Sequence, residues 1–304
     1  MKDNASFVWL LRKLLTLALL AGMIVMPMAA ASAEEAGRGR FVFAGWDGPP
    51  LLVWYQLPET VLPDTPVVVV MHGVNRDADR YRDEWADLAL AYRFIVIVPE
   101  FSRADFPGAN GYNTGFFEET DGTPRPRSQW SFAVIEPLFD DIRHRFGTAV
   151  PRYTIYGHSA GAQFVHRFVM FMPEARIEQA MAANAGWYTM PDPAIAFPYG
   201  VKGAPITAET VKTALSKPLT LLLGTADTDT ADPDLRTTAE ANRQGPHRYA
   251  RGHSFHAEGR ALADRLQIPF GWRTEDVPGV GHKNGLMAKA AARLIANHRT
   301  ERPE

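Results

Sequence analysis

The chain has 304 residues, of which 46% are hydrophobic and 22% are charged, and this is enough for one large folded domain. Its formal net charge of −2, without a long basic run, argues against nucleic acid as a partner, because binding to phosphates needs clustered Lys and Arg. The absence of cysteine excludes a Cys nucleophile, a thiolate metal site and structural disulfides.

The first residues have the three parts of a secretory signal. A basic start, an apolar run and a small-residue exit follow one another as Lys2, Arg12 and Lys13, then residues 14–28, then Ala31-Ser32-Ala33. We therefore predict that residues 1–33 are a signal peptide and that the mature protein is periplasmic or secreted, with no stable membrane association after cleavage. An uncleaved membrane anchor is the alternative, because the apolar run is nearly long enough to span a bilayer.

After this leader, strand and helix patterns alternate along the chain. Uninterrupted apolar runs are typical of strands buried on both faces of a parallel sheet, and apolar residues every three or four positions indicate helices. Strands are predicted at 52–57, 67–71, 94–98, 153–156, 177–185, 219–223 and 272–277. Helices are predicted at 85–92, 132–146, 160–172 and 286–296. The alternation predicts an α/β fold with a mostly parallel central sheet, helices on both faces and one domain over residues 34–304.

Two stretches lack this regularity. Residues 107–126 are rich in Gly and Pro and are predicted to form a long loop. Residues 187–214 contain four prolines and are predicted to form an irregular insertion over the active site. Both stretches hold aromatic residues, including Tyr112 and Trp187, which either line an acyl or aryl pocket or pack onto the body of the domain.

One short motif between a predicted strand and a predicted helix points to catalysis. Gly157-His158-Ser159-Ala160-Gly161 is a G-x-S-x-G sequence, and in this context it indicates a nucleophile elbow. Glycines two residues before and after Ser159 remove the Cβ atoms that would collide with the neighbouring strand and helix. We predict Ser159 as the nucleophile and the backbone N–H of Ala160 as an oxyanion donor.

A serine nucleophile needs a base and a carboxylate that orients the base. Asp227 follows the strand predicted at 219–223, and we prefer it over Asp229 because it is nearer to the strand end. His282 lies in a glycine-flanked loop after the last predicted strand and is the predicted base. The order Ser, Asp, His along the chain is the one found in folds with this elbow.

A second oxyanion donor is predicted after the strand at 67–71. This strand ends in His72-Gly73, and we predict the backbone N–H of Val74 as the donor, with the side-chain amide of Asn75 as an alternative.

Metal sites are less well supported. Asp227, Asp229, Asp232 and Asp234 form an acidic turn that is either solvated or a small cation site. His253 and His256 have metal-ligand spacing without an evident third ligand, and His158 and His166 are interpreted as packing or support residues. We expect no metal and no cofactor.

In chain order these motifs resemble the α/β-hydrolase superfamily over roughly residues 67–296. The matching segments are His72-Gly73, Gly157-His158-Ser159-Ala160-Gly161, Gly224-Thr225-Ala226-Asp227 and Gly281-His282. With the export signal, they most resemble bacterial exported esterases of the polyhydroxybutyrate-depolymerase and feruloyl-esterase type, although such enzymes often carry disulfides. The resemblance implies two-step acyl transfer on Ser159, without a cofactor.

The expected function is therefore a carboxylic-ester hydrolase acting on a small-molecule or polymeric ester. A serine peptidase or amidase of the same fold is the first alternative, because the triad alone does not distinguish ester from amide substrates. A non-catalytic binding protein is disfavoured, because all three triad residues are present.

Overall fold

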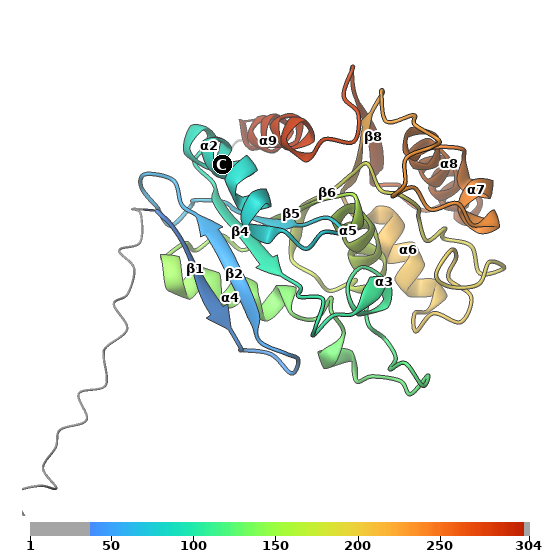
Figure 1. Cartoon of the computed structure of the whole chain (residues 1–304), viewed down its shortest axis with the longest axis horizontal. Helices are drawn as coiled ribbons and strands as arrows, with labels where there is room; N and C mark the ends of the chain where they lie inside the picture. The colour runs from blue at the N-terminus through green and yellow to red at the C-terminus, as the bar shows by residue number, and fades with distance from the viewer. Residues whose placement is uncertain (1–36, 301–304) are drawn as a thin grey trace, which may run out of the picture. The chain divides into compact units, whose positions relative to one another are not determined.

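The computed structural model describes residues 37–300, and the predicted signal peptide at 1–33 lies outside them (Figure 1). The centre of this part is an eight-stranded sheet with the order β1-β2-β4-β3-β5-β6-β7-β8. The strands are β1 (Arg38–Phe43), β2 (Leu51–Gln56), β3 (Val67–Met71), β4 (Ile95–Glu100), β5 (Tyr153–His158), β6 (Ile177–Ala183), β7 (Leu219–Gly224) and β8 (Trp272–Val277). The pairs β1–β2 and β2–β4 are antiparallel, and the other pairs of the sheet are parallel. The mostly parallel sheet is thus confirmed.

Helices cover both faces of this sheet. They are α2 (Ala78–Tyr92), α3 (Gly108–Gly111), the 3₁₀ turn η1 (Arg127–Gln129), α4 (Ile135–Phe146), α5 (Ala160–Phe171), α6 (Ala208–Ser216), α7 (Ala239–Gln244), α8 (Arg248–Leu266) and α9 (Asn284–Thr300). Residues of α2 and α9 form the core on one face, and residues of α4, α5, α6 and α8 belong to the larger core on the other.

The uninterrupted valine run of β3 follows from burial on both faces. Val67 and Val69 belong to the larger core, whereas Val68 and Val70 point into the core under α2 and α9. Successive side chains of a strand point to opposite faces, so every position of β3 must be apolar. Its neighbour β5 is likewise buried at all six positions.

Several elements differ from the sequence prediction; for example, α2 begins at Ala78 rather than at 85, and α7 was not predicted. Strand β1 was not predicted, because only Phe43 of its residues is fully buried at this edge of the sheet. The prediction that 187–214 is irregular was wrong for residues 208–214, which belong to α6, a helix capped by the Thr207 side chain. The strand predicted at 177–185 ends two residues earlier, because Asn184 adopts a positive φ of 52°.

Helix α8 was not predicted either, because its buried side is not an apolar stripe. That side contains Arg248, Arg251, Gly252 and Gly259 as well as Phe255 and Ala263. The glycines let the helix approach the sheet, since a Cβ on Gly252 would lie 2.3 Å from the Leu223 side chain. Hydrophobic periodicity alone gives no signal for such a helix.

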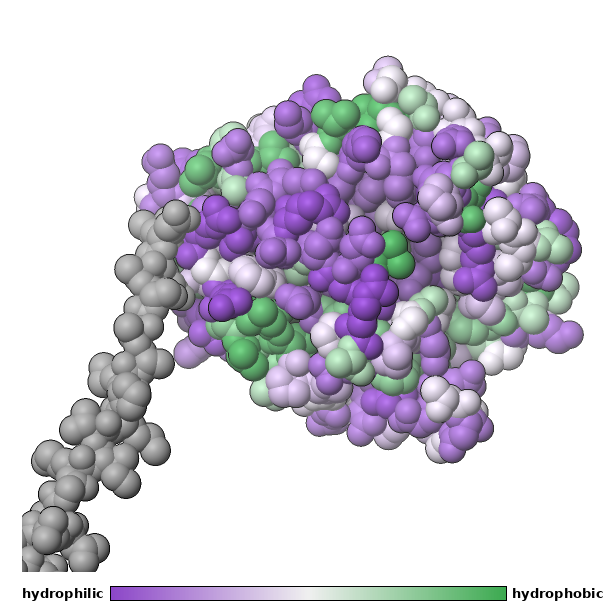
Figure 2. Space-filling model, viewed as in Figure 1, coloured by the Kyte–Doolittle hydropathy of each residue, from purple (hydrophilic) through white to green (hydrophobic). Residues whose placement is uncertain are grey.

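The surface is consistent with a domain that buries its apolar residues. The face seen in Figure 2 is mainly hydrophilic, and its hydrophobic residues form small separate groups. Within residues 37–300, none of the helices combines the length and apolar character needed to cross a bilayer.

Candidate active site

Lack of space determines which residues can flank Ser159 in the predicted nucleophile elbow. Ser159 joins β5 to α5 with φ 58° and ψ −117°, a conformation that non-glycine residues rarely adopt. A Cβ on Gly161 would lie 2.0 Å from the carbonyl oxygen of Met71, and a Cβ on Gly157 would lie 2.2 Å from that of Gly161. Only glycine therefore fits at these two positions, as the sequence analysis predicted.

The predicted acid and base are in contact. Asp227 Oδ2 lies 2.8 Å from Nδ1 of His282, and the Asp227 side chain is only 3% exposed. Arg248 of α8 lies on the other side of this carboxylate, with its Nη1 3.5 Å from Oδ1. Asp229, the alternative acid, is exposed and accepts a hydrogen bond from the N–H of Ala231 in its own turn. Asp227 is thus the carboxylate of the acidic turn that contacts His282.

The loop carrying His282 is tied to the end of β7. The N–H of Ala226 donates to the carbonyl oxygen of Val280 over 3.0 Å, and the side-chain amide of Asn184 donates to that of Gly281 over 3.1 Å. Ser159 and His282 line the same cavity of about 280 Å³. The end of β5, the end of β7 and the loop after β8 thus meet at one edge of the sheet.

The turn after β3 lies beside Ser159, the predicted nucleophile. A Cβ on Gly73 would be 3.9 Å from the Cβ of Ser159, and Val74 follows with an exposed side chain. His72 supports this turn: its Nε2 accepts from the N–H of Phe101, and its Nδ1 lies 3.0 Å from the carbonyl oxygen of Gly73. Burial lowers the pKa of His72 to about 3, so the ring is neutral.

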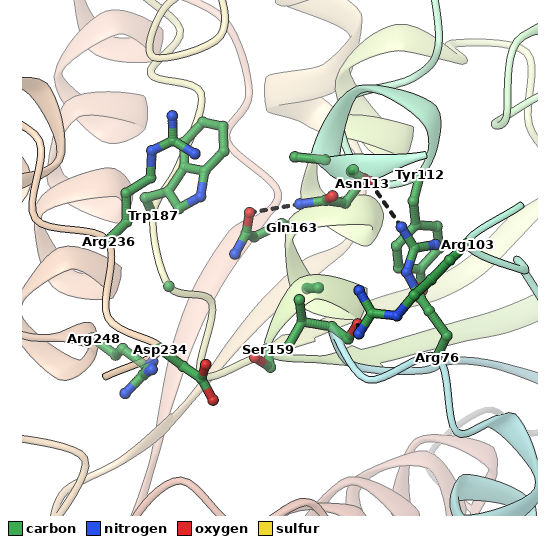
Figure 3. A pocket seen from close by; sticks show the side chains of 15 residues that line it. Arg76, Arg103, Tyr112, Asn113, Ser159, Gln163, Trp187, Asp234, Arg236 and Arg248 are labelled. Atoms are coloured by element: carbon green, nitrogen blue, oxygen red, sulfur yellow. Dashed lines mark hydrogen bonds between the residues drawn. The ribbon is translucent and has the colours of Figure 1, made fainter. Parts of the chain in front are cut away.

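On one side of Ser159 lies a cavity of about 250 Å³ that we call the arginine chamber (Figure 3). Besides Ser159, its lining includes Arg76, Arg103, Arg236, Arg248 and Trp187. In Figure 3 the guanidinium groups of Arg76 and Arg103 lie on one side of Ser159, and that of Arg248 lies on the other.

Arg76 differs from the other buried arginine of this lining, Arg248, because its guanidinium has no carboxylate partner among the described residues. Its guanidinium donates to the carbonyl oxygens of three residues and lies 4.2 Å from the ring centroid of Tyr112. Among residues 37–300 no carboxylate forms an ion pair with it. Burial lowers its pKa, which is the sign of a cation held away from water.

Two other arginines reach the chamber from exposed positions. Arg103 donates to the carbonyl oxygen of Val74 over 2.9 Å. Arg236 stacks over Trp187 at 4.8 Å, and its Nε donates to the Tyr199 hydroxyl. No sequence motif joins these arginines, and the sequence analysis did not identify them as site residues.

Comparison with solved structures places this chain in a known family. Poly(aspartic acid) hydrolase-1 from Sphingomonas sp. KT-1 matches 85% of this chain and 98% of its own at 51% identity and a TM-score of 0.84. The chain belongs to the α/β-hydrolase superfamily. A poly(3-hydroxybutyrate) depolymerase, LpqC from Bordetella parapertussis, matches this hydrolase at 35% identity over 88% of its chain and 91% of the depolymerase, with a TM-score of 0.82. No protein-family model and no curated protein sequence matches it.

These relatives make the chain a serine hydrolase of the depolymerase and esterase type. More distant structures share the fold alone, such as an S-formylglutathione hydrolase from Agrobacterium tumefaciens at 16% identity and a TM-score of 0.57.

The loop aromatics of the hydrolase divide between the two roles left open by the sequence. Tyr112 and Trp187 line the arginine chamber. Phe116 and Phe117 instead pack into the larger core, and Phe197 packs against it.

The metal alternatives find no geometric support in the described part of this hydrolase. Residues 37–300 contain no group of three or more His, Asp or Glu side chains placed to hold an ion. His253 lies 3.3 Å from a carboxylate oxygen of Asp276, and Asp232 of the acidic turn binds Arg248 at 2.7 Å. His166 accepts from the N–H of Thr189, which agrees with a packing role.

Proposed function

We propose that this hydrolase cleaves carboxylic esters through an acyl-enzyme on Ser159, with His282 as the base and Asp227 as the residue that orients it. The observation that carries the proposal is the 2.8 Å contact between Asp227 and His282 beside a strained elbow serine in a shared cavity. A solvated or purely structural histidine would not need a buried carboxylate on one ring nitrogen while it lines a cavity together with the elbow serine.

The contact favours Nε2 as the nitrogen of His282 that accepts the proton. When Nδ1–H donates to Asp227, Nε2 is left to accept the proton of Ser159. The serine oxygen then attacks the substrate carbonyl, and the backbone N–H groups of Val74 and Ala160 stabilise the oxyanion. His282 then gives the proton to the leaving alcohol. In the second step His282 takes a proton from water, the water oxygen attacks the acyl-enzyme, and Ser159 leaves with the proton from His282.

A second candidate is hydrolysis of the amide bonds in an acidic polymer. It is favoured by the four arginines of the arginine chamber, within the described residues, and by the 51% identity to a poly(aspartic acid) hydrolase. Poly(aspartic acid) carries a carboxylate on every residue, and guanidinium groups bind carboxylates with charge-assisted hydrogen bonds. The same triad chemistry applies, with an amine as the leaving group.

We further propose that the enzyme acts outside the cytoplasm, because residues 1–33 have the pattern of a secretory signal. N-terminal sequencing of the exported protein would show a start at Glu34, and a start at Met1 would contradict cleavage.

The decisive experiment compares the two substrate classes on the mature enzyme. Rates are measured with p-nitrophenyl esters of increasing acyl length and with poly(aspartic acid), in which new amine ends are counted. Turnover of esters alone supports the first candidate, and release of amines supports the second. A fluorophosphonate probe should label the wild type and not Ser159→Ala, and labelling of the variant would refute Ser159 as the nucleophile.

A further inference from the structure

The cavity that holds both Ser159 and His282 is distinct from the arginine chamber, and we call it the histidine chamber. It measures about 280 Å³, and its lining includes His158, His282, Asp77, Arg80, Tyr81 and Glu84. Ser159, Val74 and Asp234 line both chambers. The nucleophile therefore stands where two cavities meet.

The two chambers differ in charge. Among the described residues that line it, the arginine chamber has four arginines and one carboxylate, that of Asp234. In the same part of the chain, the histidine chamber has three carboxylates and two cations, Arg80 and Lys283. Arg80 is already paired with Asp77 at 2.7 Å and with Glu84 at 2.5 Å. Arg248 of the arginine chamber is likewise paired with Asp232 at 2.7 Å, so the excess of positive charge there comes from the other three arginines. An anionic group is thus favoured on the arginine side, and a neutral or cationic group is favoured on the histidine side.

His158 gives the histidine chamber a buried polar group that lacks a protein partner. Its side chain is 4% exposed, its ring lies 4.5 Å from that of His282, and its Nδ1 lies 3.3 Å from the Tyr81 hydroxyl. Burial lowers the pKa of His158 well below 6.5, so the ring carries a single proton. This proton sits on Nε2 when the Tyr81 hydroxyl donates to Nδ1, and on Nδ1 when the hydroxyl accepts.

Nε2 of His158 has no hydrogen-bond partner among the described residues. Buried polar atoms are nearly always paired, so an unpaired ring nitrogen of a residue that lines a cavity indicates a place for a polar group of a ligand or for water. Asp77 Oδ1 is a second buried polar atom of this wall without a partner in residues 37–300.

The position of His282 decides which part of a substrate each chamber receives. The imidazolium formed from His282 must protonate the leaving atom, so the leaving group has to lie on its side of Ser159. His282 lines the histidine chamber, whereas Ala160, the predicted oxyanion donor after the nucleophile, lines the arginine chamber.

We propose that the histidine chamber binds the leaving group and that the arginine chamber binds the acyl part, so that the substrate joins a carboxylate-bearing acyl part to an uncharged or cationic alcohol or amine. This assignment rests on the proposed acyl-enzyme at Ser159. When the tetrahedral intermediate collapses, the bond between carbon and the leaving atom breaks. Its electron pair stays with the leaving atom, which takes the proton from His282 Nε2. Water then enters the histidine chamber and attacks the acyl-enzyme from there.

Two matched variants test the assignment by filling one chamber each. A Cβ on Gly285, which lines the histidine chamber, would meet the Glu84 side chain at an ordinary 3.6 Å, so Gly285→Leu fits by occupying the cavity. Ala109 is exposed and lines the arginine chamber, so Ala109→Leu is its counterpart. Both variants are assayed with acetyl esters of alcohols of increasing size and with methyl esters of increasing acyl length.

The two variants should show opposite effects. Gly285→Leu is expected to lower kcat/KM about tenfold for large alcohols relative to methanol, with the dependence on acyl length unchanged. Ala109→Leu should lower kcat/KM about tenfold for long acyl chains and leave the alcohol series unchanged. A loss that follows acyl length in Gly285→Leu, or equal losses in both series, would overturn the assignment.

Acceptor competition tests the charge preference and separates this inference from the proposed function. The acetyl-enzyme is formed from p-nitrophenyl acetate in the presence of glycolamide or glycolate, and the ratio of acetylated acceptor to acetate is measured. Neutral glycolamide should capture the acetyl group several-fold better than anionic glycolate, because it enters the leaving-group chamber. Equal capture, with a fluorophosphonate-reactive Ser159, overturns the chamber assignment alone. Absence of an acyl-enzyme overturns the proposed function.

Discussion

Two regions meet at Ser159, and they are built under opposite constraints. The elbow is limited by space, since a Cβ on Gly161 would lie 2.0 Å from the Met71 carbonyl oxygen. In the wall of the arginine chamber, charge is the main constraint on which residues and ligands fit. There Arg76 is buried against carbonyl oxygens without a paired carboxylate in the described chain. We therefore expect the elbow to position Ser159 in the same way for any substrate and the wall to discriminate between substrates.

This difference also predicts how each region tolerates change. Atoms added to a packed turn force the backbone to move, so changes at the elbow should affect folding and all activities together. A buried cation without a carboxylate is costly, and an anionic ligand offsets that cost. Changes in the wall should therefore alter selectivity more than the general rate.

The largest effect on the rate is expected at Asp227, the residue proposed to orient His282. Asp227→Asn should lower kcat by about 10⁴-fold, because the amide NH2 can donate to Nδ1 of His282 and hold the ring in the wrong tautomer, and because the negative charge that stabilises the imidazolium is lost. Asp229→Asn is the matched control, because Asp229 is exposed and caps its own turn, and its rate should stay near that of the wild type. Steady-state kinetics on a p-nitrophenyl ester measures both, and the reverse order would reassign the acid.

The space constraint is tested by adding a single methyl group. Gly161→Ala should lower the free energy of unfolding by about 3 kcal/mol, because the carbonyl oxygen of Met71 cannot move without disturbing β3. Gly285→Ala is the control, since its new Cβ would make only an ordinary contact with Glu84, and we expect a change of about 0.5 kcal/mol or less. Urea denaturation measures both values, and equal stabilities of the two variants would refute a rigid elbow.

The charge constraint is tested at an exposed arginine, where folding is not at risk. Arg236→Gln should lower kcat/KM about tenfold for a p-nitrophenyl ester with a carboxylate at the end of its acyl chain, and should leave the uncharged homologue unchanged. Arg243→Gln, on the exposed side of α7, is the control and should change neither rate. The loss should shrink with added salt, and equal losses for both esters would show that Arg236 acts only through packing on Trp187.

The same two constraints explain what the sequence could predict. The elbow was predictable because its residues are consecutive and lie between a recognisable strand and helix. Asp227 and His282 were predictable from chain order, because each follows a strand at the same edge of the sheet.

The charged wall could not be predicted in this way. Arg76, Arg103, Arg236 and Arg248 are far apart in the sequence, and only the completed fold brings them to one cavity. Arg248 also belongs to α8, whose buried side lacks the apolar periodicity that reveals a helix. A buried charged residue gives the same sequence signal as an exposed one, so its burial has to be observed.

The smallest expected effect concerns His72, which supports the turn shared by both regions. Its pKa of about 3 in the folded protein lies below the usual 6.5, and burial is the main cause. Below pH 6.5 the unfolded chain therefore binds a proton that the folded protein does not, so stability falls as the pH drops from 6.5 toward 3. This histidine should contribute about 1 kcal/mol of destabilisation at pH 6 relative to pH 8. Urea denaturation of the wild type and of His72→Asn at both pH values measures the difference, and the variant should lose less stability than the wild type over this interval.

Because the His72 ring holds Gly73 and Phe101 in place, the His72→Asn variant should also lower the rates of charged and uncharged esters by the same factor. A change confined to the charged ester would mean that this turn belongs to the charge-limited wall rather than to the rigid side of the site.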